Sequence, residues 1–262
     1  MDPSSCRLGG CVQTIRVPGG TVPVETLGSG PPLLLLHGWT LDRRMWQPQL
    51  PLTESFTLVA IDRRGFGQAT APPDLAAEPD DILRVADALG LAHFHLLGMS
   101  QGGRVALAFA ARSGERLLSL TLQGTALDDV PATPEQVPLE AMAIAARAGD
   151  LATTRSLWSG HRLMRLVEPT GAPLLAAMLA DYAARDLLAP ASSLPATVDM
   201  ITGLEVVVTA IVGSDDTAQR HANNAALVEA RARPLVVPGG HLCHIDDPDA
   251  FNAVLRARLI SG

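Results

Sequence analysis

Six short apolar runs recur along the chain and constrain its fold more than any other feature of the sequence. They lie at 33–36, 57–61, 94–97, 117–122, 206–212 and 234–237. Most of them lack polar alternation, which predicts strands buried on both faces of a sheet. Helical patterns lie between or after them, at 80–89, 101–112, 217–230 and 249–260. This alternation predicts an α/β protein with a parallel sheet.

Two segments depart from the alternation. Near the N-terminus, the β-rich runs 14–17 and 22–27 flank Pro18-Gly19-Gly20, which predicts a hairpin. Between 125 and 204, helical stretches rich in Ala, Leu and Met are repeatedly interrupted by proline. We expect this segment to be a helical insertion that covers the sheet as a lid, or else a helical layer without a functional role. We therefore expect an N-terminal tail at 1–10, an α/β core domain formed by 11–124 and 205–262, and a helical cap at 125–204.

Composition excludes several functions. The formal net charge is -7 and none of the 20 basic residues is a lysine, so we expect no nucleic-acid partner. Without an ε-amino group the chain cannot perform Schiff-base or pyridoxal-phosphate chemistry, build a P-loop, or use a Ser-Lys dyad.

The sequence also bears on location and redox state. No apolar run approaches the ~18 residues of a membrane span, and the polar N-terminus lacks the apolar region of a secretory signal, so a cytoplasmic protein is expected. Leu8-Gly9-Gly10-Cys11 resembles a lipoprotein cleavage box, but a frayed tail is favoured because no hydrophobic stretch precedes it. Cys6, Cys11 and Cys243 are odd in number without CxxC spacing, which favours reduced thiols. The oligomeric state cannot be derived from these patterns.

The strongest chemical signal is Gly98-Met99-Ser100-Gln101-Gly102-Gly103, between an apolar run and a helical pattern. A Gly-x-Ser-x-Gly turn holds its serine in a strained backbone conformation, and the residues two before and two after must lack bulk. Gly98 and Gly102 meet this requirement. The motif predicts Ser100 as a nucleophile.

With this motif in place, the chain resembles the α/β-hydrolase family, particularly small bacterial esterases and lactonases with a helical cap. His37-Gly38-Trp39 resembles the family's oxyanion loop, and Asp62-Arg63-Arg64-Gly65-Phe66-Gly67 resembles its Asp-x-Arg-Gly-x-Gly turn. Gln68-Ala69 replaces the small-Ser pair that usually follows the turn. The resemblance covers all but about the first ten residues. It implies a mostly parallel, eight-stranded sheet flanked by helices, with a helical cap insertion.

The resemblance also implies a base and an acid, in the chain order Ser, acid, His. Gly239-Gly240-His241 matches the family's Gly-His loop, which favours His241 as the base over His244, three residues later. Gly213-Ser214-Asp215-Asp216 resembles the Gly-x-x-Asp of the family and favours Asp216 as the acid. Asp215 is the neighbouring alternative, and Asp128 or Asp129 is a further one because some relatives place the acid after the preceding core strand.

The oxyanion hole is expected to consist of the backbone N–H groups of Trp39 and Gln101. Large side chains that we expect to line an apolar pocket are Trp39, Met99, Trp158, Met164 and Tyr182. The alternative is that the last three only pack cap helices. A metal site is not expected, because the adjacent His241, Cys243, His244 and Asp246 fit no standard zinc spacing.

These features predict a serine hydrolase of the carboxylesterase or lactonase type (EC 3.1.1), which cleaves a small, largely apolar ester or lactone through an acyl-enzyme on Ser100 without a cofactor. Fold and triad do not choose among the reactions of the family, so carbon–carbon bond hydrolysis and perhydrolase-like chemistry stay open. A cofactor-free lyase or oxygenase that uses His241 without an acyl-enzyme is the rival from another class. A binding protein with a vestigial triad is the third alternative.

Overall fold

The computed structural model describes residues 9–131 and 137–261. Most of the predicted N-terminal tail, including Cys6, lies outside these residues, as does the stretch 132–136 of the predicted cap. Cys11 and Cys243 are free thiols. In the part of the chain that is described, no helix combines the length and apolar character that crossing a membrane requires.

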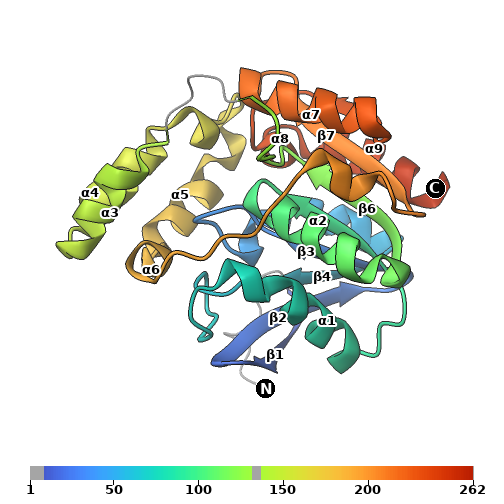
Figure 1. Ribbon diagram of the computed structural model, residues 1–262, viewed down its shortest axis with the longest axis horizontal. Helices are drawn as coiled ribbons and strands as arrows, with labels where there is room; N and C mark the ends of the chain where they lie inside the picture. Colours follow the sequence, from blue (N-terminus) through green and yellow to red (C-terminus); the bar gives the residue numbers. More distant parts are fainter. Residues whose placement is uncertain (1–8, 132–136, 262) are drawn as a thin grey trace.

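An eight-stranded, mostly parallel sheet forms the centre of the molecule, as predicted (Figure 1). Its strands, in chain order, are β1 (Cys11–Val17), β2 (Gly20–Gly28), β3 (Pro32–Leu36), β4 (Thr57–Ile61), β5 (Phe94–Met99), β6 (Leu117–Gln123), β7 (Val207–Gly213) and β8 (Arg233–Val237). Their spatial order is β1-β2-β4-β3-β5-β6-β7-β8, with β1 and β2 paired as the expected hairpin and β2 antiparallel to β4. All later pairs are parallel.

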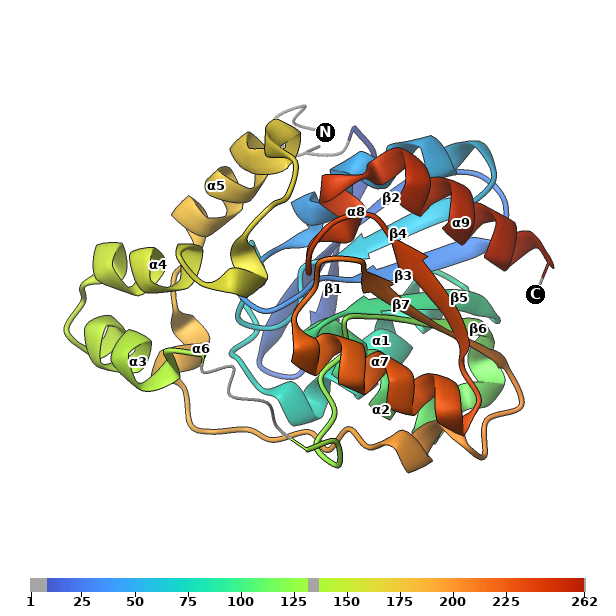
Figure 2. The ribbon, with the colours of Figure 1, turned by 90° about the horizontal axis from the view of Figure 1, so that it is seen from above.

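Helices cover both faces of the sheet (Figure 2). On one face lie α1 (Glu78–Ala88), α2 (Gln101–Ser113) and α7 (Ala218–Ala230); on the other lie α8 (Cys243–Asp246), α9 (Pro248–Ser261) and a 3-10 segment, Arg43–Glu54. Strand β3 shows why both faces need cover. Leu33 and Leu35 pack into one apolar core while Leu34 and Leu36 pack into the other, and all four are buried.

Strand β8 differs from the expectation of a strand buried on both faces. It forms the edge of the sheet beside β7, and Val236 is 62% exposed. An apolar run at a sheet edge cannot be distinguished by composition from one at its centre.

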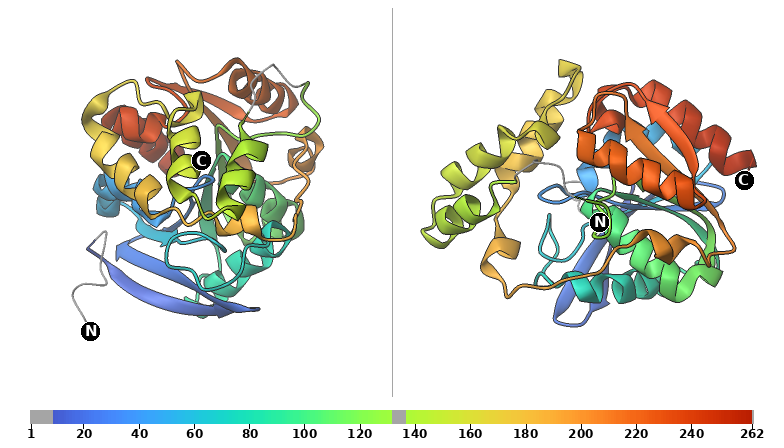
Figure 3. Two further views of the ribbon diagram at one scale, coloured as in Figure 1. Left: turned by 90° about the vertical axis from the view of Figure 1, so that its left-hand side faces the viewer. Right: turned by 45° about the horizontal axis from the view of Figure 1, so that its top comes forward.

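In its described residues, the predicted insertion contains four α-helices, which project beyond the carboxyl ends of the central strands (Figures 1 and 3). They are α3 (Leu139–Arg147), α4 (Leu151–Ser159), α5 (Ala172–Asp181) and α6 (Arg185–Leu188). The chain then runs back along the body of the molecule and packs against α2 and α7, and its residues Leu194, Ala196 and Ile201 are buried in the apolar core of that face. The helical group therefore spans 139–188, and the later part of the predicted insertion packs as core.

Candidate active site

Ser100 occupies the turn between the central strand β5 and helix α2. Its backbone has φ 53° and ψ -113°, a left-handed conformation that is strained for any residue with a Cβ. The Ser100 N–H donates to the carbonyl of Gln123 at the end of β6, 2.8 Å away. The turn predicted from the glycine spacing is therefore formed and anchored to the neighbouring strand.

The glycines around Ser100 leave no room for side chains. A Cβ on Gly98 would lie 2.3 Å from the carbonyl oxygen of Gly102, and one on Gly102 would lie 2.5 Å from the carbonyl oxygens of Leu36 and His37. Such contacts are shorter than real Cβ atoms tolerate. The close approach of three backbone segments is the physical reason for glycine at these positions.

His241 and Asp216 form a buried pair after the two last strands of the sheet. His241 Nδ1 lies 3.0 Å from Asp216 Oδ2, and the two residues are 3% and 5% exposed. Burial raises the pKa of Asp216, but the charge of His241 and the hydrogen bonds from His241 and from the Thr217 N–H outweigh it and lower the pKa below its usual value. A carboxylate that stays ionised beside Nδ1 favours the tautomer with the proton on Nδ1 and a free acceptor at Nε2.

The alternative acids point elsewhere. Asp215 is exposed and accepts from the hydroxyl of Ser214. Asp128 makes a bidentate pair with Arg104, at 2.7 and 2.8 Å. Asp129 accepts from the backbone of Val198 at 2.9 Å. Of the predicted candidates, Asp216 is the one that the structure brings to His241.

His244 occupies a different environment from His241. It is fully buried between Trp46 and Phe251, and its Nδ1 lies 2.8 Å from Gln123 Nε2. Burial, together with His241, lowers the pKa of His244 to about 3, so the ring is neutral at physiological pH. Its contacts are those of a core residue that braces the loop carrying His241.

The loop after β3 brings Trp39 beside Ser100. A Cβ on Gly38 would lie 2.7 Å from Met99 Sδ and 3.7 Å from Ser100 Cβ, so this loop passes directly over the serine. His37 fixes the loop from below: its Nδ1 bonds the Gly38 carbonyl at 2.8 Å and its Nε2 accepts from the Arg63 N–H at 3.0 Å. Burial and the nearby Arg63 lower the pKa of His37 to about 3, which keeps the ring neutral.

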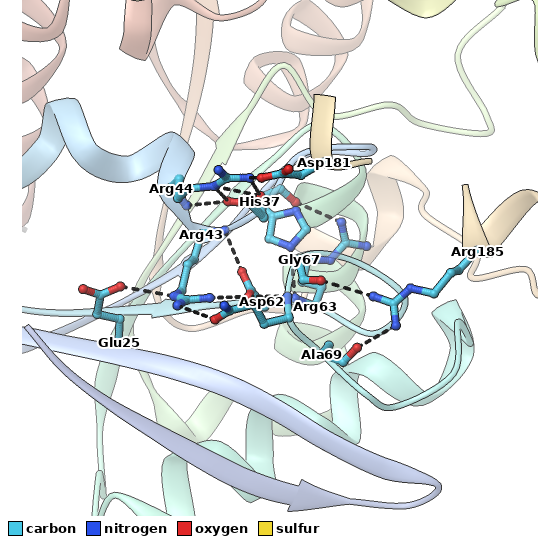
Figure 4. A network of polar contacts seen from close by, with 12 residues as sticks. Glu25, His37, Arg43, Arg44, Asp62, Arg63, Gly67, Ala69, Asp181 and Arg185 are labelled. Carbon is cyan, nitrogen blue, oxygen red and sulfur yellow. Dashed lines mark hydrogen bonds and ion pairs between the residues drawn. The ribbon is translucent and has the colours of Figure 1, made fainter. Parts of the chain in front are cut away.

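Arg63 of the turn 62–67 ties the loop after β3 to the core, and Arg43 of the 3-10 segment binds the turn itself, as Figure 4 shows. Arg63 donates to the His37 carbonyl at 2.9 Å, to Gln101 Oε1 at 3.0 Å and to buried Glu78. Arg43 is buried between Glu25 and Asp62, both of which accept from its guanidinium. Breaking one such buried pair typically costs ~3–5 kcal/mol. Sequence analysis noted the Asp62–Gly67 motif only as a resemblance and did not assign Arg63 a position beside the two expected oxyanion donors.

A pocket of about 180 Å³ opens at Ser100 and is also lined by His241, Trp39 and Gln101. Of the predicted lining residues, Met99, Trp158 and Met164 also line it, together with Leu41 and Leu163, which were not predicted. Arg104 and Arg220 reach it as well.

Tyr182 lies outside this pocket. Its hydroxyl donates to Asp186 Oδ1 at 2.8 Å, and the indole of Trp39 donates to Oδ2 of the same carboxylate at 2.6 Å. In the opposite direction, the indole of Trp158 in α4 donates to Thr40 Oγ1 of the loop after β3 at 2.7 Å. The helices of residues 139–188 and the loop after β3 are thus linked by hydrogen bonds in both directions, and sequence analysis identified neither Asp186 nor Thr40.

Asp246, at the end of the short helix α8 that follows His241, stabilises the backbone of this region. Asp246 accepts from the N–H groups of Gly240 at 2.8 Å and Val167 at 2.7 Å. Within residues 9–131 and 137–261, no group of three or more His, Cys, Asp or Glu side chains has the geometry to hold a metal ion.

Fold and site together define the class of protein: a serine, a histidine and an aspartate gather at the carboxyl ends of parallel strands in an α/β fold. A family model described as the alpha/beta hydrolase fold matches residues 31–201. The chain belongs to this family.

Individual relatives differ in their reactions. The chain is 33% identical over 124 residues to AB hydrolase superfamily protein YisY of Bacillus subtilis, covering 44% of this chain and 46% of that one. It is 37% identical over 116 residues to a fluoroacetate dehalogenase of Burkholderia sp, covering 40% of this chain and 36% of the relative. The chain therefore matches less than half the length of either protein. A thermophilic esterase from Thermogutta terrifontis superposes with a TM-score of 0.81 at 26% identity, covering 96% of this chain and 98% of the esterase.

Proposed function

We propose that this chain is a serine hydrolase that cleaves a carboxylic ester or lactone of a small, largely apolar substrate through an acyl-enzyme on Ser100. One observation carries the proposal: strained Ser100 opens into the same pocket as His241, whose Nδ1 lies 3.0 Å from buried Asp216. This arrangement supplies a nucleophile, a base and a group that orients the base.

The proposed reaction uses only groups of this chain and water. His241 Nε2 takes the proton of the Ser100 hydroxyl as the oxygen attacks the substrate carbonyl. The backbone N–H groups of Trp39 and Gln101 stabilise the resulting oxyanion, and each such donor is worth ~10²–10³-fold in rate. Collapse expels the alcohol, which takes the proton from His241. Water activated by His241 then attacks the acyl-enzyme, which releases the acid and restores Ser100.

The serine favours a carbonyl substrate over the substrates of some relatives, which include a fluoroacetate dehalogenase and a soluble epoxide hydrolase. Attack by Ser100 on a halogen-bearing carbon or an epoxide carbon would leave an ether, which has no carbonyl for water to attack. Attack on an ester or lactone leaves an ester, which the same His241 can hydrolyse. A 3-oxoadipate enol-lactonase, 30% identical over 113 residues, supports lactones within this class.

The walls of the pocket favour an apolar substrate. Trp158 of α4 and the residues Leu163 and Met164, which follow α4, are all buried and line the pocket together with Met99 of the core. We propose that residues 139–188 act as the cap of this site, because they supply one wall and contact the loop of Trp39.

The test is hydrolysis of a panel of nitrophenyl and methyl esters and simple lactones by the wild type, Ser100→Ala and Ser214→Ala. Ser214 is an exposed serine beside the acid loop and serves as the matched control. We expect turnover by the wild type and the control, and its loss in Ser100→Ala. Retention of activity in Ser100→Ala, or no turnover of any ester or lactone by the wild type, would overturn the proposal.

A further inference from the structure

A second, larger cavity lies next to the Ser100 pocket, between the cap and the core. It has a volume of about 510 Å³ and is lined from the cap side by Leu139, Ala143 and Leu187 and from the core side by Phe66 and Leu75, among others. Trp39 and Gln101 line both cavities, so the two meet at the proposed oxyanion donors. We call this second cavity the groove.

The Ser100 pocket is small for a substrate site. Small-molecule sites typically measure ~300–1,000 Å³, whereas the pocket at Ser100 measures only about 180 Å³. With the groove added, the site reaches this range. The Ser100 pocket by itself lies below this range.

The charged groups of the groove already have protein partners. Arg64 pairs with Asp81, and Glu78 pairs with Arg63. Asp74 accepts from Ser192 at 2.8 Å.

Asp186 holds Trp39 and Tyr182. Among the described residues that line the groove, Arg64 is the one basic side chain, and it is paired with Asp81. Asp74 and Asp186 therefore have no basic neighbour in the lining that is free to bind a ligand. An anionic ligand would thus meet two carboxylates, while an uncharged apolar chain would bury its surface against leucine, phenylalanine and alanine.

The position of His241 decides which end of the substrate enters the groove. His241 must pass its proton to the leaving alcohol, so the alcohol lies beside it. His241 and Ser100 line the Ser100 pocket and not the groove, which begins on the side of Trp39 and Gln101. The alcohol therefore belongs in the small pocket, and the acyl chain extends away from His241.

We propose that the groove is the acyl-binding subsite and that the preferred substrate is an ester of a small alcohol with a long, uncharged, apolar acyl chain. This inference rests on the proposed function. The reaction is the one described above: the acyl carbon transfers from the small alcohol to Ser100 and then to water, and the groove holds the chain throughout.

The experiment compares two ester series with the wild-type protein. One series consists of methyl esters from acetate to decanoate, and the other of acetates of alcohols of increasing length. Each methylene that becomes buried contributes ~0.8 kcal/mol, about fourfold in kcat/KM. We expect kcat/KM to rise with acyl length and to stay flat or fall with alcohol length.

Two variants narrow the groove, Ala143→Trp on α3 and Ala191→Trp on the segment after α6, and both residues line it. The matched control is Ile144→Trp, the next residue of α3, which is 57% exposed and does not line the groove. We expect both groove variants to lower kcat/KM for methyl decanoate by at least about tenfold, the burial of roughly two methylenes. Methyl acetate, whose acyl group is too short to fill the groove, should lose far less activity than methyl decanoate in the two groove variants, and Ile144→Trp should leave the hydrolysis of both esters unchanged.

The outcomes separate the two proposals. Activity that grows with alcohol length, or groove variants that match Ile144→Trp on methyl decanoate, overturns the acyl subsite while ester hydrolysis by Ser100 stands. Absence of turnover in both series, with lactones also inert, overturns the proposed function and the subsite with it. Loss of methyl acetate hydrolysis in both groove variants would show that the groove does not act separately from the Ser100 pocket, and it also refutes the subsite.

Discussion

Replacement of Asp216 by asparagine tests how the base is prepared for its role. Oδ1 of Asp216 accepts from the Thr217 N–H at 2.7 Å, and Oδ2 faces His241 Nδ1 at 3.0 Å. In Asp216→Asn the Thr217 N–H selects the amide oxygen for the first position, which leaves the amide NH₂ against Nδ1. Nδ1 must then accept, the proton moves to Nε2, and His241 can no longer take the Ser100 proton. We expect kcat to fall about 10⁴-fold, the cost typical of this change in a catalytic triad.

The assay is steady-state hydrolysis of the best ester or lactone found with the wild type. Asp215→Asn is the matched control, because Asp215 is the exposed neighbour that the sequence also offered as an alternative acid. It should keep kcat within about twofold, as surface changes usually do. The reasoning is refuted if Asp216→Asn retains a tenth or more of the activity, or if Asp215→Asn is the more damaging change.

Two further predictions concern the residues around this pair. Gly124 has φ 53°, and a Cβ there would lie 2.8 Å from His241 Cε1, so Gly124→Ala should displace the ring and lower kcat by about 100-fold or more. Gly149→Ala, at φ 76° with open space around it, imposes a similar backbone strain and should leave kcat unchanged. His37 and His244 stay neutral down to about pH 3 in the folded chain but bind protons below about pH 6.5 when unfolded, so stability falls on acidification. In urea unfolding, the free energy of unfolding should fall by about 3 kcal/mol between about pH 7.5 and pH 5.5 because of these two histidines, and by about half as much in His244→Gln. An equal fall in the wild type and the variant would contradict this.

The parts of the site that local chemistry dictates could be predicted from the sequence. The turn at Ser100 needs glycine at Gly98 and Gly102 because three backbone segments meet there, and this requirement is visible as spacing. His241 and Asp216 were implied by the resemblance to the family's loops, which follow apolar runs that are recognisable as strands. For the same reason, the sheet and its flanking helices were predicted closely.

Features that depend on which surfaces meet in three dimensions could not be predicted. The bulk of Tyr182 suits a residue that lines a pocket, yet its hydroxyl donates to Asp186 and the residue does not line the Ser100 pocket. Leu194 and Ile201 belong to a proline-interrupted stretch that resembles residues 139–188 in composition, but they are buried against the core on the face of α2 and α7. Arg63 has no local pattern that announces its three acceptors, which come from separate parts of the chain.

The most direct test of the central claim is to look for the acyl group on Ser100. A reaction of the wild type with a slowly released ester, quenched in acid during turnover and digested, allows the peptide that contains Ser100 to be weighed by mass spectrometry. We predict that this peptide carries the mass of the acyl group, and that Ser100→Ala carries none. Steady turnover with the Ser100 peptide unmodified throughout would contradict the acyl-enzyme and would favour the lyase or oxygenase chemistry in which His241 acts alone.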